Sequence, residues 1–269
     1  MKHGATAIYI VHFSKLKNRK ERLDRMIKHD NLQVEFITED DIEFREDVFS
    51  SCRNAFGINF RISSMDRSNN SRSIVKSRRV ARLEGYLLLL RSYLMPRGMR
   101  YLTDNPFPTR EPDSILELTL MHFECLRRAI SQEYEWMLVL EDDALFEPKK
   151  LMTLLGNLDV LRQNSPVWYN ISSGANLRRT KTDPKPDQFG FFRIRPYGTR
   201  CSSGYLINRQ FATEVLGLIE RYGIPDWTAV DVIYQILQRK TRAKVYWQEP
   251  PLVCQGSETG LYSSNLGHF

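Results

Sequence analysis

The stretch Trp136-Met-Leu-Val-Leu-Glu-Asp-Asp-Ala144 decides how this chain is interpreted. Its five largely apolar residues favour a buried strand, and Glu141, Asp142 and Asp143 follow at the strand's carboxyl end. Three neighbouring carboxylates repel one another and resist dehydration, so they are typical of a place where a cation is held. Hard oxygen ligands suit Mg²⁺ or Mn²⁺, which leave coordination positions open for phosphates. The stretch therefore indicates nucleotide chemistry, with an acid-rich helix N-terminus as the alternative.

The composition is that of a globular protein. Of the 269 residues, 42% are hydrophobic and 26% are charged, which suits one α/β domain over residues 1–269 with no apolar run long enough to cross a bilayer. Residues 7–11 are too short an apolar stretch for a signal peptide. The four cysteines are too widely spaced to indicate a zinc cluster or a disulfide framework: Cys52, Cys125, Cys201 and Cys254. We therefore expect a cytoplasmic protein.

The net charge of +7 favours anionic partners such as nucleotide diphosphates, acidic lipid headgroups or nucleic acid. Residues 59–82 concentrate this charge in seven basic residues among Ser and Asn: Arg61, Arg67, Arg72, Lys76, Arg78, Arg79 and Arg82. An apolar helix over residues 86–94 is predicted to follow. Residues 59–95 are thus a basic insertion and helix within the domain, either a solvated loop or a contact surface for an anionic acceptor or membrane.

The hydrophobic periodicity predicts a strand over residues 6–13, a helix over 17–29 and a strand over 34–38. Such a βαβ start predicts a mostly parallel central sheet flanked by helices. A helix over residues 115–130 should pack beneath the acidic strand. His122 lies on its apolar face and is interpreted as a structural histidine, with a direct ligand as the alternative.

The remaining elements alternate in the same way. Small residues in the loop 172–176 allow its backbone, at Gly174 above all, to approach a ligand closely. The other predicted elements are helices over residues 148–162, 210–222 and 230–238 and strands over 167–171, 191–194, 202–207 and 243–247.

Several stretches, taken in order, carry a resemblance to a known family: Ala5-Thr-Ala-Ile-Tyr-Ile-Val-His-Phe-Ser14 with Asn18, Arg19 and Arg22; Leu118-Thr-Leu-Met-His122; Met137-Leu-Val-Leu-Glu-Asp-Asp-Ala144; Gly198-Thr-Arg-Cys-Ser-Ser-Gly-Tyr-Leu-Ile-Asn-Arg209 with Ala212; then Asp231, Pro250-Pro251 and Gln255. On these residues the chain resembles glycosyltransferase family 25, which includes lipooligosaccharide and collagen galactosyltransferases. The family usually has Gly-Glu and Ser-His in the helix before the acidic strand, where this chain has Ser114-Ile115 and Met121-His122.

This resemblance implies a GT-A-like fold, Mn²⁺ or Mg²⁺ held by the acidic motif, and a nucleotide-sugar donor, with a UDP-sugar favoured. It also implies transfer of a hexose, galactose being favoured, with inversion to a glycan hydroxyl such as that of lipooligosaccharide or polysaccharide. In the motif we assign Asp143 to the metal, Asp142 to the metal or the donor ribose, and Glu141 to support through water or backbone. If the strand persists, alternation points Asp142 away from the other two acids.

An inverting transfer needs a base for the acceptor hydroxyl. Asp231 is the preferred candidate and Asp226 the second, because the family carries an acid near its acceptor site at this place. A helix cap is the alternative for each.

The donor is expected where the first strand ends, at His12, Phe13 and Ser14, with Arg19 or Arg22 on the phosphates. Helix surfaces carry many such arginines, so a solvated role is the alternative. The segment after Pro250-Pro251, here called the tail, either folds over the phosphates or is a frayed end. Its polar residues are Gln255, Ser257, Glu258 and His268.

Two other functions stay open. One is a metal-dependent phosphoryl or nucleotidyl transfer enzyme or nuclease, which no P-loop or RNA-binding pattern supports. The other is a non-catalytic glycan-binding relative.

Overall fold

The structure is a computed structural model that describes residues 6–30, 33–43, 113–161, 164–174, 177–181, 183–194, 200–222 and 230–262. The predicted insertion and helix over 59–95, the candidate base Asp226 and the tail residue His268 lie outside these ranges.

A seven-stranded sheet forms the centre of the described part, in the order β2-β1-β3-β7-β5-β8-β6. The strands are β1 (Thr6–Val11), β2 (Glu35–Ile37), β3 (Trp136–Glu141), β5 (Val167–Asn170), β6 (Phe191–Ile194), β7 (Gly204–Asn208) and β8 (Lys244–Gln248). β1 pairs in parallel with both β2 and β3, and β5 pairs in parallel with β8. β7 runs antiparallel to both of its neighbours, and β6 runs antiparallel to β8. The α/β class and the parallel start are confirmed, and the sheet as a whole is mixed.

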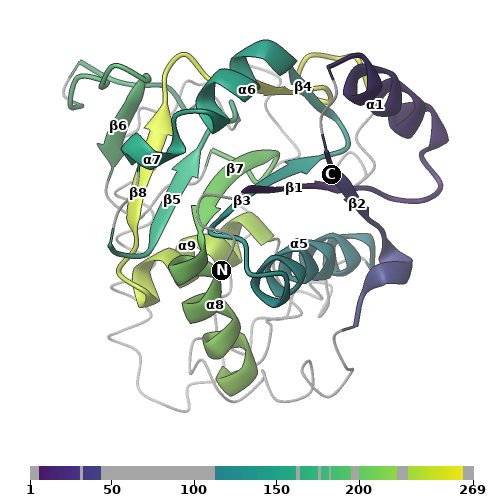
Figure 1. Cartoon of the computed structure of the whole chain (residues 1–269), viewed down its shortest axis with the longest axis horizontal. Coiled ribbons are helices and arrows are strands. Elements are labelled where there is room, and N and C mark those ends of the chain that lie inside the picture. The colour runs from purple at the N-terminus through teal and green to yellow at the C-terminus, as the bar shows by residue number, and fades with distance from the viewer. Residues whose placement is uncertain are drawn as a thin grey trace, which may run out of the picture.

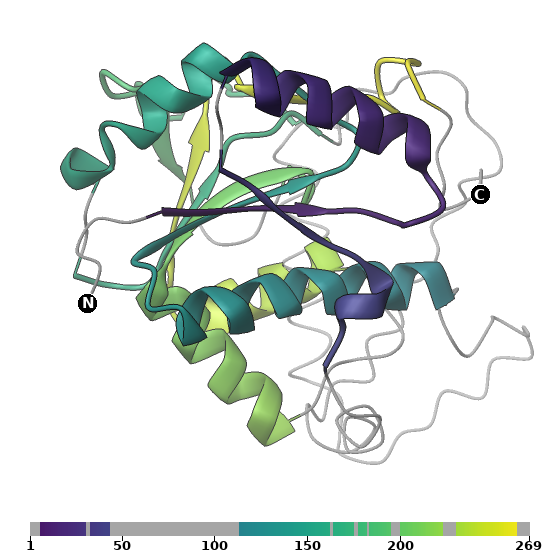
Figure 2. The same cartoon turned by 45° about the vertical axis from the view of Figure 1, so that its right-hand side comes forward.

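Helices cover both faces of this sheet (Figures 1 and 2). One face carries α1 (Lys17–Asp30), α6 (Pro148–Leu155) and α7 (Leu158–Leu161), and the other carries α5 (Asp113–Ser131), α8 (Arg209–Tyr222) and α9 (Val230–Lys240). Alternation along β3 supplies both cores, because Met137 and Val139 pack on the α5 side while Leu138 packs on the α1 side. α5 packs against β3, as predicted. None of the described helices is both long and apolar enough to span a membrane.

The single helix predicted over residues 148–162 is wrong, because the structure ends α6 at Leu155 and begins α7 at Leu158. Gly156 caps α6 by donating its backbone N–H to the Met152 carbonyl, and Asn157 Nδ2 donates to the Thr153 carbonyl at 2.6 Å. Glycine is a poor helix former, and the asparagine amide competes for a helical acceptor, so the helix breaks there.

A two-stranded sheet lies directly after the acidic motif. β4 (Ala144–Phe146) pairs antiparallel with β9 (Val253–Gln255), and the Gly256 N–H donates to the Asp143 carbonyl at 2.9 Å. Neither three-residue strand was predicted. Their pairing brings the segment 256–262 to the acidic end of β3. A 3-10 helix, η1 (Glu39–Asp41), follows β2, which is an edge strand of the seven-stranded sheet.

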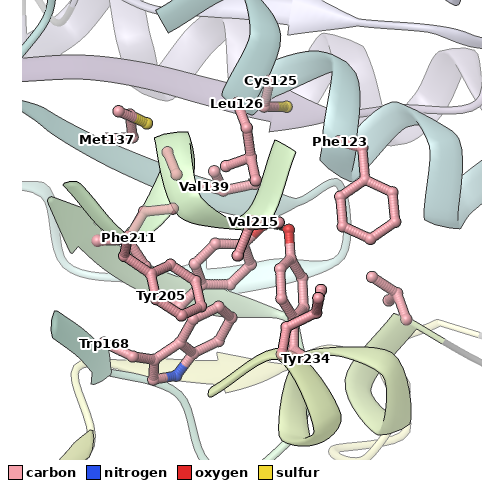
Figure 3. Packing of buried hydrophobic residues seen from close by; sticks show 14 of the residues in the cluster. Phe123, Cys125, Leu126, Met137, Val139, Trp168, Tyr205, Phe211, Val215 and Tyr234 are labelled. Atoms are coloured by element: carbon pink, nitrogen blue, oxygen red, sulfur yellow. Dashed lines mark hydrogen bonds between the residues drawn. The ribbon is translucent and has the colours of Figure 1, made fainter. Parts of the chain in front are cut away.

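An aromatic cluster fills the core beneath α8 and α9 (Figure 3). The Trp168 ring stacks on Tyr205 with centroids 4.2 Å apart and lies 4.6 Å from the ring of Tyr234. Since all three side chains are fully buried, the cluster fixes β5, β7 and α9 relative to one another.

Trp168→Ala is expected to lower the free energy of unfolding by about 3–5 kcal/mol, because it leaves a large cavity in this cluster. Urea denaturation followed by circular dichroism measures the change. Val160→Ala, at a position that is 63% exposed on α7, is the control and should change stability by less than about 0.5 kcal/mol. Equal losses for the two variants would contradict the assignment of this cluster as core.

Candidate functional site

The site lies where β1 and β3 end side by side. Val11, the last residue of β1, pairs with Glu141, the last residue of β3. Because the two strands are parallel, the residues that follow β1 and the acidic motif come to the same edge of the sheet. Carboxyl ends of parallel strands commonly form ligand-binding crevices.

Asp142 is buried on the α1 side and is bonded through both oxygens. Arg19 Nη1 on α1 donates to Oδ1 at 2.6 Å, and His12 Nδ1 donates to Oδ2 at 3.0 Å. These three side chains are each no more than 8% exposed. The cationic guanidinium offsets the burial of the carboxylate, so Asp142 ties β3 to β1 and α1. A metal or ribose role for Asp142 stays a prediction.

Glu141 points to the opposite face, toward α5. Ser202 Oγ donates to its Oε1 at 2.7 Å, and its backbone N–H donates to the Ser203 carbonyl at 3.1 Å. His122 Nε2 lies 3.6 Å from the same Oε1, within range of a charge contact but longer than a hydrogen bond. No described residue bonds the second oxygen, Oε2.

Asp143 is buried, and no basic side chain among the described residues forms an ion pair with it. Its Oδ2 accepts from Ser257 Oγ at 2.8 Å and from the Ser257 N–H at 3.2 Å, while its Oδ1 is buried with no hydrogen-bond partner in the described residues. Burial first, and the charge of Glu141 second, raise the pKa of Asp143 to about 6. A buried carboxylate with an unused oxygen beside a second carboxylate is an arrangement that a cation would relieve.

These two acids fit the Mn²⁺ or Mg²⁺ that the resemblance implies. Such ions are often held by one or two carboxylates, the other positions being left to water and phosphate. Within the described ranges, no group of three or more His, Cys, Asp or Glu side chains is placed around one point to hold a metal. The structure thus fits an ion held by Glu141 and Asp143 and completed by its ligand.

Asp231 is brought to the same region from the first turn of α9. Burial raises the pKa of the Cys201 thiol well above its usual value, and four carboxylates raise it further: Glu141, Asp231, Glu258 and Asp143. These acids come from β3, α9, the tail and the turn after β3, and each lies within range of a charge interaction with this thiol. Cys201 has a φ of 101°, which residues other than glycine rarely adopt and which occurs often at functional sites.

The tail is folded onto the arginines of α1. The Tyr262 ring lies 4.8 Å from the guanidinium of Arg19 and 5.6 Å from that of Arg22, and Arg22 Nη2 donates to the Ala144 carbonyl at 2.7 Å. Both arginines predicted to meet phosphate therefore lie beside the acidic motif. The described tail residues Gln255, Ser257 and Glu258 lie there too.

The other predicted donor contacts have local partners. Ser14 donates from Oγ and from its N–H to Glu39, at 2.6 and 3.0 Å, and Phe13 is buried in the α5-side core. A Cβ on Gly174 would lie 1.7 Å from the Arg200 carbonyl oxygen. Glycine at 174 is therefore required by the close approach of the chain's own backbone, and a ligand contact there stays a prediction.

Sequence analysis gave no role to two residues that the structure places beside the acids. Ser202 bonds Glu141, and Cys201 lies close enough to four acids for their charges to raise the pKa of its thiol. Arg200, the residue before them, is buried against Trp247 with Glu249 as its ionic partner. The signal for this stretch was its place within Gly198–Arg209, which carries part of the resemblance but assigns no role to these residues.

Comparison with protein-family models found no family that matches this chain, and comparison with curated proteins found no match.

Asp143→Asn should stabilise the metal-free protein at pH 8. The folded pKa of about 6 lies above the ordinary 3.8, so stability falls as pH rises from about 4 to 6 and stays reduced above it. Asparagine removes the charge and keeps an acceptor for Ser257, so the free energy of unfolding should rise, by about 3 kcal/mol at most.

Asp142→Asn is the matched control and should have the opposite sign. It leaves the buried Arg19 guanidinium without its carboxylate, which costs about 3–5 kcal/mol. Urea denaturation of both variants with and without EDTA measures the difference. If both substitutions destabilise the protein equally, the charge of Asp143 does not cost stability in the way that its burial and its closeness to Glu141 indicate.

Proposed function

We propose that this chain is a metal-dependent inverting glycosyltransferase that moves a hexose from a nucleotide sugar to a hydroxyl of a glycan. The observation that carries the proposal is the pair Glu141 and Asp143 at the carboxyl end of β3, where Asp143 Oδ1 is buried with no hydrogen-bond partner among the described residues. Asp231 lies within range of a charge interaction with Cys201, as these two acids do. In the sequence analysis Asp143 is assigned to the metal, Glu141 to support through water or backbone, and Asp231 to the base. Because no described residue bonds Glu141 Oε2, we propose Glu141 as a direct ligand as well. The mixed α/β sheet is compatible with the GT-A-like fold that we propose with it.

The donor's phosphates would lie between the two acids and α1. Glu141 Oε2 and Asp143 Oδ1 would hold Mn²⁺ or Mg²⁺, which when bound neutralises the charge that develops on the departing nucleoside diphosphate. Arg19 is close enough for its charge to lower the pKa of Asp143, so it adds positive potential on the same side. Asp142, which is itself bonded by His12, holds Arg19 in place.

Asp231 would take the proton of the acceptor hydroxyl. It stands in the first turn of α9, on the α5 face of the sheet, within electrostatic reach of Cys201 and of the acids that surround the thiol. Inversion requires the base and the leaving group to lie on opposite sides of the anomeric carbon. The acceptor hydroxyl would therefore lie between Asp231 and that carbon, with the departing diphosphate on the far side.

The acceptor class that we propose is a lipooligosaccharide or polysaccharide at the inner face of the cytoplasmic membrane. The net charge of +7 would hold the protein near acidic lipid headgroups. A UDP-sugar, with galactose as the hexose, is the donor that the resemblance favours.

Donor hydrolysis tests the reaction class. UDP-, GDP- and CMP-sugars are incubated with the protein in Mn²⁺ or in EDTA, and release of nucleotide is measured. We expect slow, Mn²⁺-dependent release of UDP. Degradation of oligonucleotides would instead establish a nuclease, and a Mn²⁺-dependent rise in melting temperature without turnover of any sugar would establish a non-catalytic relative.

Asp231→Asn should lower transfer by about 100-fold or more and leave Mn²⁺ and UDP binding unchanged, because it removes only the proton acceptor. Binding is measured by calorimetry and transfer by nucleotide release with acceptor present. Asp159→Asn, which removes an acid from the first turn of α7 on the other face of the sheet, is the control and should keep full transfer. Unchanged transfer in Asp231→Asn would move the base elsewhere, with Asp226 as the next residue to test.

A further inference from the structure

A buried line of polar side chains runs from Glu141 into the α5-side core. His122 Nε2 lies 3.6 Å from Glu141 Oε1, and His122 Nδ1 lies 2.9 Å from the Tyr205 hydroxyl. The Tyr205 hydroxyl in turn lies 2.9 Å from that of Tyr234. His122, Tyr205 and Tyr234 are all 0% exposed. Polar atoms so deeply buried cost free energy unless they bond one another, and the hydrogen bonds along this line offset that cost.

The line connects the two halves of the candidate site. Its members come from β3, α5, β7 and α9, and the rings of Tyr205 and Tyr234 lie together above Trp168 (Figure 3). Tyr234 is the third residue after Asp231 on α9, so the two lie on one side of that helix. The line therefore runs from an acid assigned to the cation to the helix that carries the candidate base.

The hydrogen bonds along the line have one consistent direction. Burial raises the pKa of both tyrosines, so each hydroxyl keeps a single proton to donate. If Tyr234 donates to Tyr205 and Tyr205 donates to His122 Nδ1, the imidazole proton lies on Nε2 and faces Glu141. In the reverse direction the Tyr234 proton has no acceptor in the described residues, and a lone pair on Nε2 would face a carboxylate.

We propose that His122 is a positioning residue that holds Glu141 for the cation, and that Tyr205 and Tyr234 fix its tautomer. This role rests on the proposed function, because it concerns the same cation site. Nε2 is buried with no hydrogen-bond partner in the described part of the chain, and Glu141 Oε1 is the acceptor in front of it. Contacts of this kind are often long without ligand and tighten when the complex forms. With Oε1 held by Ser202 and His122, Oε2 is the oxygen left for the cation.

The test measures Mn²⁺ affinity by calorimetry on the full chain, with transfer as a second readout. Tyr205→Phe removes one oxygen and leaves the ring, so the tautomer is no longer fixed. We expect its Mn²⁺ Kd to rise by about 10-fold or more, as is usual when a partner of a metal ligand is lost. His122→Leu should give a similar loss, and His122→Gln, whose amide N–H replaces Nε2–H, should recover most of the affinity.

Tyr9→Phe is the matched control. It removes another buried tyrosine hydroxyl, on β1, that has no hydrogen-bond partner in the described residues, and it should leave the Mn²⁺ Kd unchanged. Urea denaturation of each variant separates loss of fold from loss of affinity. Because Tyr205→Phe deletes a single atom, it keeps the test decisive if His122→Leu does not fold.

The outcomes separate this role from the proposed function. If the wild-type protein binds no Mn²⁺ with or without UDP, the proposed function fails and this role fails with it. If the wild-type protein binds Mn²⁺ and both Tyr205→Phe and His122→Leu bind it equally well, the positioning role alone is overturned. Failure of His122→Gln to recover affinity when His122→Leu loses it would also overturn the assignment of Nε2–H as the group that acts.

Discussion

Alternation of side chains along β3 is the constraint on which the rest of the structure depends. Successive residues of the strand face opposite layers, so the same periodicity that buries Val139 under α5 and Leu138 under α1 also separates two neighbouring acids. Glu141 faces His122 and the aromatic core, while Asp142 faces His12 and Arg19. The neighbouring residues Glu141 and Asp142 therefore contact the side-chain layers on opposite faces of the sheet.

The structure offsets the cost of burying a carboxylate at Asp142 and leaves much of it in place at Asp143. Asp142 has a guanidinium and an imidazole as partners, which makes it part of the framework that fixes β1, β3 and α1. Among the described residues, Asp143 has the hydroxyl and N–H of Ser257 as its hydrogen-bond donors, and one of its oxygens has no partner. Its raised pKa indicates that ionising the buried Asp143 carboxyl costs stability, which is expected of a binding site within a stable scaffold.

Long periodic segments were predictable from the sequence, and short or non-local features were not. The apolar spacing of α5 and the acids at the end of β3 can each be recognised within one short stretch of sequence. β4 and β9 have three residues each and form only because they pair with one another, so no local pattern predicts them. The partners of Asp142 lie more than 120 residues away, and the break at Gly156 is one residue inside an otherwise helical pattern. The acids could be predicted, but the groups that give each acid its role could not.

The docking of β9 against β4 has a consequence for biosynthesis. The acidic end of β3 is synthesised 114 residues before Ser257. Until Gly256 and Ser257 reach Asp143, its backbone carbonyl lacks the hydrogen bond from Gly256, and its carboxylate lacks those from Ser257. The site is therefore completed only after these residues have been synthesised, and a nascent polypeptide halted before residue 253 would carry most of the central sheet without the groups that bond Asp143.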